Sequence, residues 1–495
     1  MNVPGADFWY TETIMLLPLV AALLGILAFL PFPLFYWFGF LFLAPLFVWY
    51  TKERSLRKLI VGTIMFRLIF AMGTTYYTLE PIAWGISLLI FCGLPLSIWA
   101  LTLAYKTITT RTMPAWLLLA SMPIVWTIWD SLAARYSPLP TTIISAGNVV
   151  GSSPFVGLAA IAGITGLTIF IASINALIAT TMLHIGDKRR IKKHAIAYAM
   201  PCIGIIVVIA FALAISTAII DRKSAEYRQR KEYITITTVS VAKSITPTQH
   251  AALSDAIAHT SADLVVFPEG FFNKPNRAPY QTAAEMTATM TRLLPSDLAA
   301  GAGVFDFKAG NMDGKTGTAI LATKNGTIQG THNKARLSFA GEYWPFGAWH
   351  PSLYDWVKTQ NHDIDAYAMF GKQNGYKKGS LNTIRAVIGG RPTTLAVVVC
   401  MELQYPSDIA WYGAQGAQFI ANPTSNRWLT AGKDHFLFLA NNLRRIESIH
   451  TNMPIIISGI EDIGGVFTPD GRKQAVYYEQ TTNGYAILSA TINLK

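Results

Sequence analysis

Residues 331–345 read THNKARLSFAGEYWP, a polar and aromatic segment that contains Lys334 and Glu342. In the surrounding chain, short apolar runs alternate with polar, helical patterns, which predicts an α/β fold with buried strands. The expected strands are 233–241, 264–267, 318–323, 395–399, 419–421 and 454–458, and the expected helices are 246–259, 281–294 and 435–450.

Two of the expected strands run directly into chemically reactive side chains. LVVF at 264–267 precedes a Pro-Glu pair that ends at Glu269, and LAVVV at 395–399 precedes Cys400 and, two residues later, Glu402. In α/β folds, functional groups gather at the ends of buried strands. Taken singly, Glu269 could be a strand cap and Cys400 a core residue, so only their combination indicates a site.

The first part of the chain has a different composition. Of the 495 residues, 52% are hydrophobic and 14% are charged, whereas soluble domains carry about 25% charged residues. Residues 1–220 hold 13 Lys and Arg and 6 Asp and Glu, and residues 221–495 hold 27 and 22. This partition excludes an ordinary cytosolic enzyme. It predicts a transmembrane helical domain over 1–220 and a soluble domain over 221–495, and it favours membrane loops over nucleic-acid binding as the source of the net +12 charge.

Seven stretches are apolar enough to cross a bilayer, which takes about 20 residues: 14–30, 34–50, 59–77, 82–105, 115–134, 155–183 and 195–220. Basic loops after the second, fourth and sixth stretches are expected in the cytoplasm, which puts the soluble domain on the outer face. Arg67 lies inside the third stretch, and if that stretch does not cross, the soluble domain is cytoplasmic. Arg67 is expected to face a lipid-headgroup cavity or to reach the interface, and Asp130 to pair with Arg135.

In the order Glu, Lys, Cys, the three motifs resemble those of the nitrilase (carbon–nitrogen hydrolase) superfamily. With the multispan first half, the chain resembles the membrane-embedded branch of bacterial apolipoprotein N-acyltransferases. The most specific match has six residues at fixed spacing: Lys334, Leu337, Gly341, Glu342, Tyr343 and Pro345. The resemblance implies a polytopic α-helical membrane region followed by an α-β-β-α sandwich, in a bacterial inner membrane.

The resemblance also implies a Glu-Lys-Cys triad. Because a thiol is mostly protonated at neutral pH, Cys400 needs a base or a nearby cation to become a nucleophile. Glu269 would be the general base, Lys334 would stabilise the thiolate and the oxyanion, and Glu342, Glu402 and Tyr343 would orient the lysine or the substrate. Cys400 would take an acyl chain from a phospholipid as a thioester and pass it to the N-terminal amine of a lipoprotein. Neither a cofactor, nor a metal ion, nor a nucleic-acid partner is implied.

Several residues depart from the family pattern. No apolar run after residue 220 is long enough for the family's last transmembrane helix, and Phe339-Ala340 stands where the family has Pro-Phe. The later Asn-Asp-x-Trp motif is shortened to Asn426-Arg427-Trp428. These changes leave open a conjugal-transfer or envelope component with an altered, amidase-like substrate or without turnover.

Three further alternatives concern single segments. A Cys/His hydrolase could use Cys400 with His332 or His435. The aromatic segment 343–376, which ends in lysines, is compatible with a loop at the headgroup level or with an ordinary packed loop. Residues 310–316, GNMDGKT, favour a hairpin turn over a phosphate loop, because the glycine spacing is one residue short.

Overall fold

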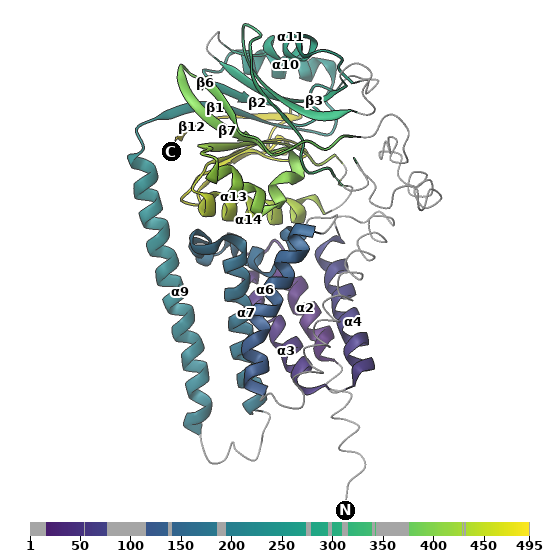
Figure 1. Ribbon diagram of the computed structural model, residues 1–495, viewed down its shortest axis with the longest axis vertical. Coiled ribbons are helices and arrows are strands. Elements are labelled where there is room, and N and C mark those ends of the chain that lie inside the picture. Colours follow the sequence, from purple (N-terminus) through teal and green to yellow (C-terminus); the bar gives the residue numbers. More distant parts are fainter. Residues whose placement is uncertain are drawn as a thin grey trace, which may run out of the picture. The chain divides into compact units, whose positions relative to one another are not determined.

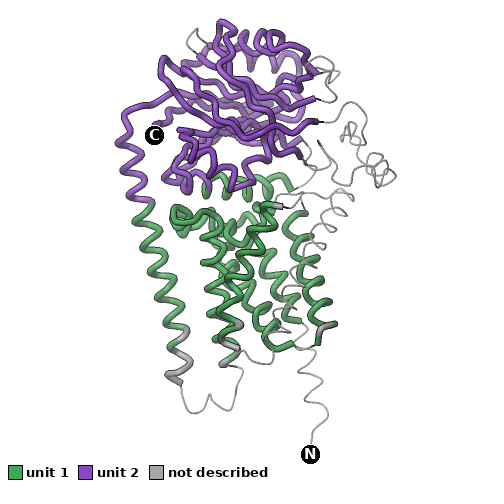
Figure 2. The backbone as a smooth tube through the Cα atoms, viewed as in Figure 1, with its two compact units in different colours: residues 1–219, 430–446 green, residues 220–429, 447–495 purple. Residues whose placement is uncertain are grey.

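The computed structural model describes residues 16–53, 55–76, 115–136, 141–185, 195–273, 279–295, 299–308, 315–338, 342, 376–427, 429 and 432–494. The chain divides into two compact units (Figure 2). The first holds residues 1–219 and 430–446, and the second holds residues 220–429 and 447–495.

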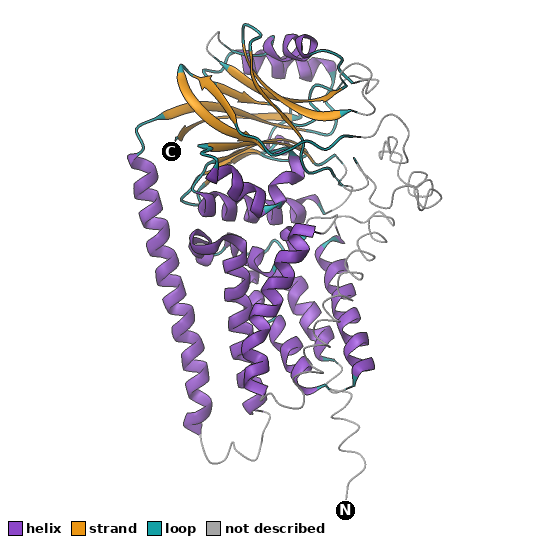
Figure 3. Cartoon of the chain, in the orientation of Figure 1, coloured by secondary structure: helices purple, strands orange, loops and turns teal. Residues whose placement is uncertain are grey.

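Every regular element among the described residues of the first unit is a helix (Figures 1 and 3). Its helices are α2 (Leu17–Phe29), η1 (Phe35–Phe40), α3 (Leu43–Lys52), α4 (Leu56–Thr74), α6 (Ala115–Tyr136), η3 (Thr142–Ile144), η4 (Ala146–Ser152), η5 (Pro154–Leu158), α7 (Ala159–Ile185) and most of α9 (Ala195–Gln229). Among the described residues, two helical stretches are long and apolar enough to cross a membrane, Pro154–Leu183 and Cys202–Gln229. The expected span 82–105 lies outside the described residues, so the seven-span region stays a prediction.

Residues 34–50 were expected to form one span, but they form η1 followed by α3. Leu34 has a φ of 71°, in the left-handed region that turns the chain sharply. Pro45 lies in the first turn of α3, where its missing N–H costs nothing, whereas inside a continuous helix it would remove a hydrogen bond. The proline therefore makes a fresh helix start near Leu43 more favourable than one long helix.

A buried side chain from α7 holds that helix start. Asn175 is fully buried, and its Oδ1 accepts hydrogen bonds from the backbone N–H groups of Leu43 (2.8 Å) and Ala44 (3.0 Å). Its Nδ2 donates to the carbonyls of Gly39 (2.9 Å) and Ile171 (2.8 Å). Since the first N–H groups of a helix have no partner within it, Asn175 acts as a cap supplied from another helix.

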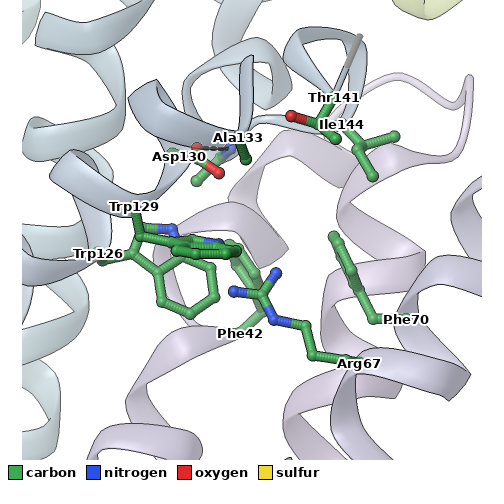
Figure 4. A pocket seen from close by; sticks show the side chains of 10 residues that line it. Phe42, Arg67, Phe70, Trp126, Trp129, Asp130, Ala133, Thr141 and Ile144 are labelled. Atoms are coloured by element: carbon green, nitrogen blue, oxygen red, sulfur yellow. Dashed lines mark hydrogen bonds between the residues drawn. The ribbon is translucent and has the colours of Figure 1, made fainter. Parts of the chain in front are cut away.

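Arg67 of α4 lies in the interior of the first unit. Its guanidinium lies 4.6 Å from the ring centre of Trp126 and lines a cavity of about 30 Å³ together with Asp130 (Figure 4). Asp130 accepts hydrogen bonds from the Ser145 hydroxyl (2.6 Å) and the Ala146 N–H (3.2 Å). A cavity of this size has room for about one or two water molecules, and the expectation that Arg67 faces a lipid headgroup stays a prediction. The Asp130 and Arg135 pair stays a prediction.

The second unit is built on a mixed sheet. Its strands among the described residues are β1 (Tyr233–Val241), β2 (Leu264–Val266), β3 (Ala300–Phe307), β4 (Thr316–Thr323), β5 (Ile328–Asn333), β6 (Ile384–Ile388), β7 (Arg391–Val397), β8 (Phe419–Ser425), β9 (Ile455–Ile460), β10 (Gly464–Phe467), β11 (Lys473–Val476) and β12 (Tyr485–Asn493). The order is β5-β4-β3-β2-β1-β9-β8-β7-β6, with β12 beside β1 and β10 between β9 and β11.

The sheet is nearly closed on itself. Its two end strands meet where the Gln329 side chain of β5 makes two hydrogen bonds to the backbone of Val387 in β6, at 2.6 and 3.0 Å. One set of alternating side chains, including Ile236, Val266 and Val397, forms a core inside the closed sheet. The other set packs outward against helices on two sides.

The helices of the second unit form the outer layers (Figure 3). Leu253 of α10 (Pro247–Ala258) and Met290 of α11 (Ala283–Thr291) pack on the β1–β4 side. Tyr412 of α13 (Pro406–Ala414) packs on the β7–β9 side. Helix α14 (Lys433–Thr451) is shared, because its residues up to 446 belong to the first unit. The α/β fold with buried strands that was predicted for this part of the chain is thereby confirmed.

The strand directions decide where the predicted site residues lie. The strands β3, β2, β1, β9, β8 and β7 are joined by parallel pairings, and β5 runs in the same direction because it is separated from β3 by the antiparallel β4. Carboxyl ends of strands that share one direction lie at one edge of a sheet. Glu269, Lys334 and Cys400 follow β2, β5 and β7, so all three leave the sheet at this edge.

The cap on α3 leads to a prediction about the stability of the first unit. Replacing Asn175 with Leu preserves the volume approximately and leaves the buried Leu43 N–H without its acceptor. We expect a loss of about 1–3 kcal/mol in the free energy of unfolding, measured by thermal or chemical denaturation of the full chain in detergent. Thr181→Val is the matched control, since that hydroxyl bonds the Leu177 carbonyl of its own helix. Equal stability of the two variants would contradict the cap.

Candidate active site

Cys400 lies at a sharp turn between β7 and η7 (Cys400–Gln404). Its φ of 54° is uncommon for a residue with a side chain, and such strain is often concentrated at reactive groups. The Asn422 side-chain amide of β8 donates hydrogen bonds to the carbonyls of Val398 and Cys400, the latter at 3.2 Å. The Sγ atom lies 3.9 Å from the Ser425 carbonyl. Two neighbouring strands therefore hold the turn that carries the thiol.

Lys334 follows β5 directly and is held by backbone on both sides. Its N–H donates to the Gly317 carbonyl of β4 (2.9 Å), and its carbonyl accepts from the Gly379 N–H (2.8 Å). Only 1% of its side chain is exposed. The Nζ atom donates to Glu269 Oε1 and to Glu342 Oε1, both at 2.9 Å. The ammonium thus connects two carboxylates that the sequence predicted as site residues.

The two carboxylates reach Lys334 from different segments. Glu269 follows β2, and the next residue, Gly270, has a φ of 75°, a conformation that favours glycine. Glu342 is fixed by Ser338, whose N–H donates to Oε2 at 2.7 Å and whose carbonyl accepts the Glu342 N–H at 2.8 Å. Ser338 was not predicted from the sequence, and its place four residues before Glu342 is the only signal for it.

Burial and neighbouring charges shift the acid–base properties of the site. Burial raises the pKa of the Cys400 thiol well above its usual range, and the Glu269 charge adds to this effect, against Lys334. Burial also raises the pKa of Glu269, whereas Lys334 and a hydrogen bond with Cys400 oppose the rise. Burial alone would lower the pKa of Lys334, but Glu269, Glu342 and Cys400 outweigh it and raise the pKa. The resting site therefore holds a protonated thiol and a charged lysine, with the Glu269 carboxyl beside them.

Glu402 has a buried structural position near the thiol. Its Oε1 accepts hydrogen bonds from the backbone N–H groups of Ala335 and Arg336, the latter at 3.1 Å. Its Oε2 accepts from the Val399 N–H at 2.6 Å. The side chain joins the segment after Lys334 to the strand end before Cys400, so it is placed to orient the lysine.

Tyr343 lies outside the described residues, as does most of the aromatic segment 343–376. The end of that segment is described. The Tyr376 hydroxyl donates to Asp306 Oδ1 at 2.7 Å, and Lys315 Nζ donates to Asp306 Oδ2 at 2.7 Å. Asp306 was missed in the sequence, although an acid within the apolar strand β3 is a visible signal. This cluster fixes the chain that returns to Lys334 through Gly379.

The geometry gives no support to His332 or His435 as a base for Cys400. Both ring nitrogens of His332 are engaged, Nδ1 with Asn382 at 2.8 Å and Nε2 with Glu402 at 3.2 Å. His435 belongs to the first unit, where its ring lies against that of Tyr76, with the ring centres 4.9 Å apart and the planes tilted by 34°. Among the residues that the structure describes, no three His, Cys, Asp or Glu side chains are grouped to hold a metal ion.

Comparisons with known proteins match both parts of the chain. Residues 233–448 match the family described as carbon–nitrogen hydrolase, and residues 21–177 match the apolipoprotein N-acyltransferase N-terminal domain. No curated protein matches the chain.

Solved structures are similar to about half of the chain. A variant of the Nesterenkonia AN1 amidase from the nitrilase superfamily is 17% identical, with 53% of this chain and 91% of that chain covered and a TM-score of 0.36. Saccharomyces cerevisiae Nit3, a member of branch 10 of the nitrilase superfamily, is 14% identical, with 53% and 91% covered and a TM-score of 0.35.

Because Lys334 pairs with two carboxylates, we expect its replacement to lower the free energy of unfolding by an amount that depends on pH. In Lys334→Met, Glu269 and Glu342 remain close together in a buried site, which raises their pKa values in the folded protein. A raised carboxyl pKa means that the folded state binds more protons, so stability falls as pH rises. We expect a loss of about 3–5 kcal/mol above neutral pH and a smaller loss at mildly acidic pH, measured by denaturation.

The double variant Lys334→Met with Glu342→Gln is expected to recover part of the loss, because one carboxylate is removed. Lys324→Met is the control, since that ammonium donates to the Leu294 carbonyl rather than to a carboxylate. A pH-independent loss in Lys334→Met would contradict the charge argument.

Proposed function

Since the chain is an apolipoprotein N-acyltransferase-like protein of the nitrilase superfamily, we propose that it is a membrane acyltransferase with Glu269, Lys334 and Cys400 as its catalytic triad. The observation that carries this proposal is the ammonium of Lys334, which bonds Glu269 and Glu342 at 2.9 Å beside the Cys400 thiol. A general base, a cation and a nucleophile then lie in one buried site.

The first half-reaction forms a thioester. Glu269 accepts the Cys400 proton as Sγ attacks the ester carbonyl of the acyl donor, and Lys334 stabilises the oxyanion that develops. One such donor contributes about 3–4 kcal/mol to the transition state. The carbon–oxygen bond of the ester then breaks, and the leaving alkoxide takes the proton from Glu269.

The second half-reaction restores the thiol. An amine attacks the thioester carbonyl, Glu269 removes the amine proton, and the carbon–sulfur bond breaks to leave an amide. The thiolate then recovers its proton from Glu269. Glu402, which ties the Lys334 segment to the Cys400 turn, keeps the reacting groups in register through both steps.

We propose a phospholipid as acyl donor and the N-terminal amine of a lipoprotein as acceptor. The match of residues 21–177 to the N-terminal domain of apolipoprotein N-acyltransferases supports a site that is supplied from a membrane. So does helix α9, because only 11% of the most apolar 18 residues within Cys202–Gln229 are buried. Its exposed apolar side chains include Ile203, Ile206, Val207 and Phe211.

We further propose a bacterial inner-membrane location, with seven spans in residues 1–220 and the catalytic domain of residues 221–495 on the outer face. The alternation of basic loops along the sequence supports this orientation.

The acyl-enzyme is the direct test of the reaction. After incubation of the full chain with phospholipid, we expect mass spectrometry to find a fatty-acyl adduct on Cys400. The adduct is expected to be lost in Glu269→Gln and Lys334→Ala, and addition of a lipopeptide amine should discharge it from the wild type.

The chain carries its own control in Cys202, which is exposed and should stay unmodified. An adduct from a short-chain amide but none from phospholipid would favour the amidase-like alternative. If the folded protein forms no adduct with phospholipid or with a short-chain amide, the result would contradict an enzyme of this kind.

The orientation is tested by labelling in cells with a membrane-impermeant maleimide, in a background in which the native cysteines Cys92, Cys202 and Cys400 are replaced by Ser. Asp255→Cys, at an exposed position of α10, should be labelled in intact cells if the catalytic domain lies outside. Arg57→Cys, in the expected cytoplasmic loop, should be labelled only after permeabilisation. The reverse pattern would place the domain in the cytoplasm.

A further inference from the structure

His332 is buried two residues before Lys334, at the end of β5. Its side chain is fully excluded from solvent and lies between Asn382 and Glu402. Nδ1 is 2.8 Å from Asn382 Oδ1, and Nε2 is 3.2 Å from Glu402 Oε2.

The hydrogen-bond partners of the His332 ring determine which of its two nitrogens carry a proton. The Asn382 Nδ2 group donates to the Thr331 carbonyl at 2.9 Å, so the amide oxygen faces His332 and can only accept. Glu402 also acts as an acceptor, since three backbone N–H groups already point at its two oxygens. Both ring nitrogens must therefore donate, which requires the imidazolium form.

The imidazolium completes the link that Glu402 makes. Ala335 and Arg336 bind one oxygen of Glu402 immediately after Lys334, and Val399 binds the other immediately before Cys400. The charge of His332 compensates the buried carboxylate of Glu402, which would otherwise be costly to keep there. The pair thus joins two of the three catalytic segments without touching the thiol.

We propose that His332, as a buried imidazolium paired with Glu402, is a positioning residue that holds the Lys334 segment in register with the Cys400 turn. The inference rests on the proposed function of the triad. Sequence alone suggested His332 as a base, and the geometry points instead to a fixed cation that works through Glu402.

The proposal implies a pH dependence of defined sign. Burial lowers the pKa of His332, but the hydrogen bond and charge of Glu402, with Asn382, outweigh burial and raise the pKa above its ordinary value. These are the charged and polar groups that face the ring. A raised pKa means that the link is complete at low pH and is lost as pH rises through the value in the folded protein.

The test measures the rate at which iodoacetamide alkylates Cys400, read from its peptide by mass spectrometry in the full chain in phospholipid nanodiscs. His332→Gln keeps a donor for Glu402 but removes the charge. We expect it to slow alkylation by up to roughly 100-fold at neutral pH, as small misplacements of reacting groups do. The wild-type and variant rates should converge at alkaline pH, where the wild-type ring also loses its charge.

Two further variants keep the outcome interpretable. Asn382→Leu removes the acceptor of Nδ1. In this variant, the alkylation rate should converge with the His332→Gln rate at a lower pH than the wild-type rate does. His259→Gln changes an exposed histidine of similar chemistry and should leave the profile unchanged.

Equal rates for His332→Gln and the wild type at every pH would overturn the proposal. A ratio of wild-type to His332→Gln alkylation rates that is the same at every pH would also overturn the proposal, since the ring would then contribute only to packing. Alkylation needs no acyl donor, so a missing acyl adduct on wild-type Cys400 would refute the proposed function and leave this test intact.

Discussion

The structure depends on one buried ammonium. Lys334 has almost no access to solvent and bonds two carboxylates, one of them 65 residues away in sequence. Without the carboxylates the cation would be too costly to bury, and without the cation the two carboxylates would repel each other. The backbone hydrogen bonds to Gly317 and Gly379 and the link through Glu402 all fix where this ammonium lies.

In the proposed mechanism, the same group allows the proton of Cys400 to move without a change in the total charge of the site. When the thiol is neutral, the lysine and the two carboxylates leave one net negative charge in the site. Transfer of the proton from Cys400 to Glu269 only relocates that charge to sulfur, beside Lys334. A buried site can accommodate a relocated charge far better than an additional one, which explains why a thiol with a raised pKa is compatible with nucleophilic attack.

The sequence predicted the features that short segments encode. The β-branched run 233–241 is β1, and the expected helix 246–259 is α10, with Thr246 as its N-cap in a capping box completed by Gln249. The order of Glu, Lys and Cys motifs predicted side chains that the fold brings together. Strand β3 was missed because AGAGVFDF is rich in small residues, and β12 because its alternation is weak. The His332–Glu402 pair joins residues 70 apart, and no local pattern marks such a contact.

Helix α14 crosses the border between the two units. The carbon–nitrogen hydrolase match extends to residue 448, yet residues up to 446 belong to the helical unit. Asn148 donates to the Leu439 carbonyl at 3.0 Å, and Arg445 donates to the Gly151 carbonyl at 3.1 Å. A fragment that began at residue 221 would therefore carry half a helix stripped of its partners, and low activity of such a fragment would reflect this damage rather than a need for lipid.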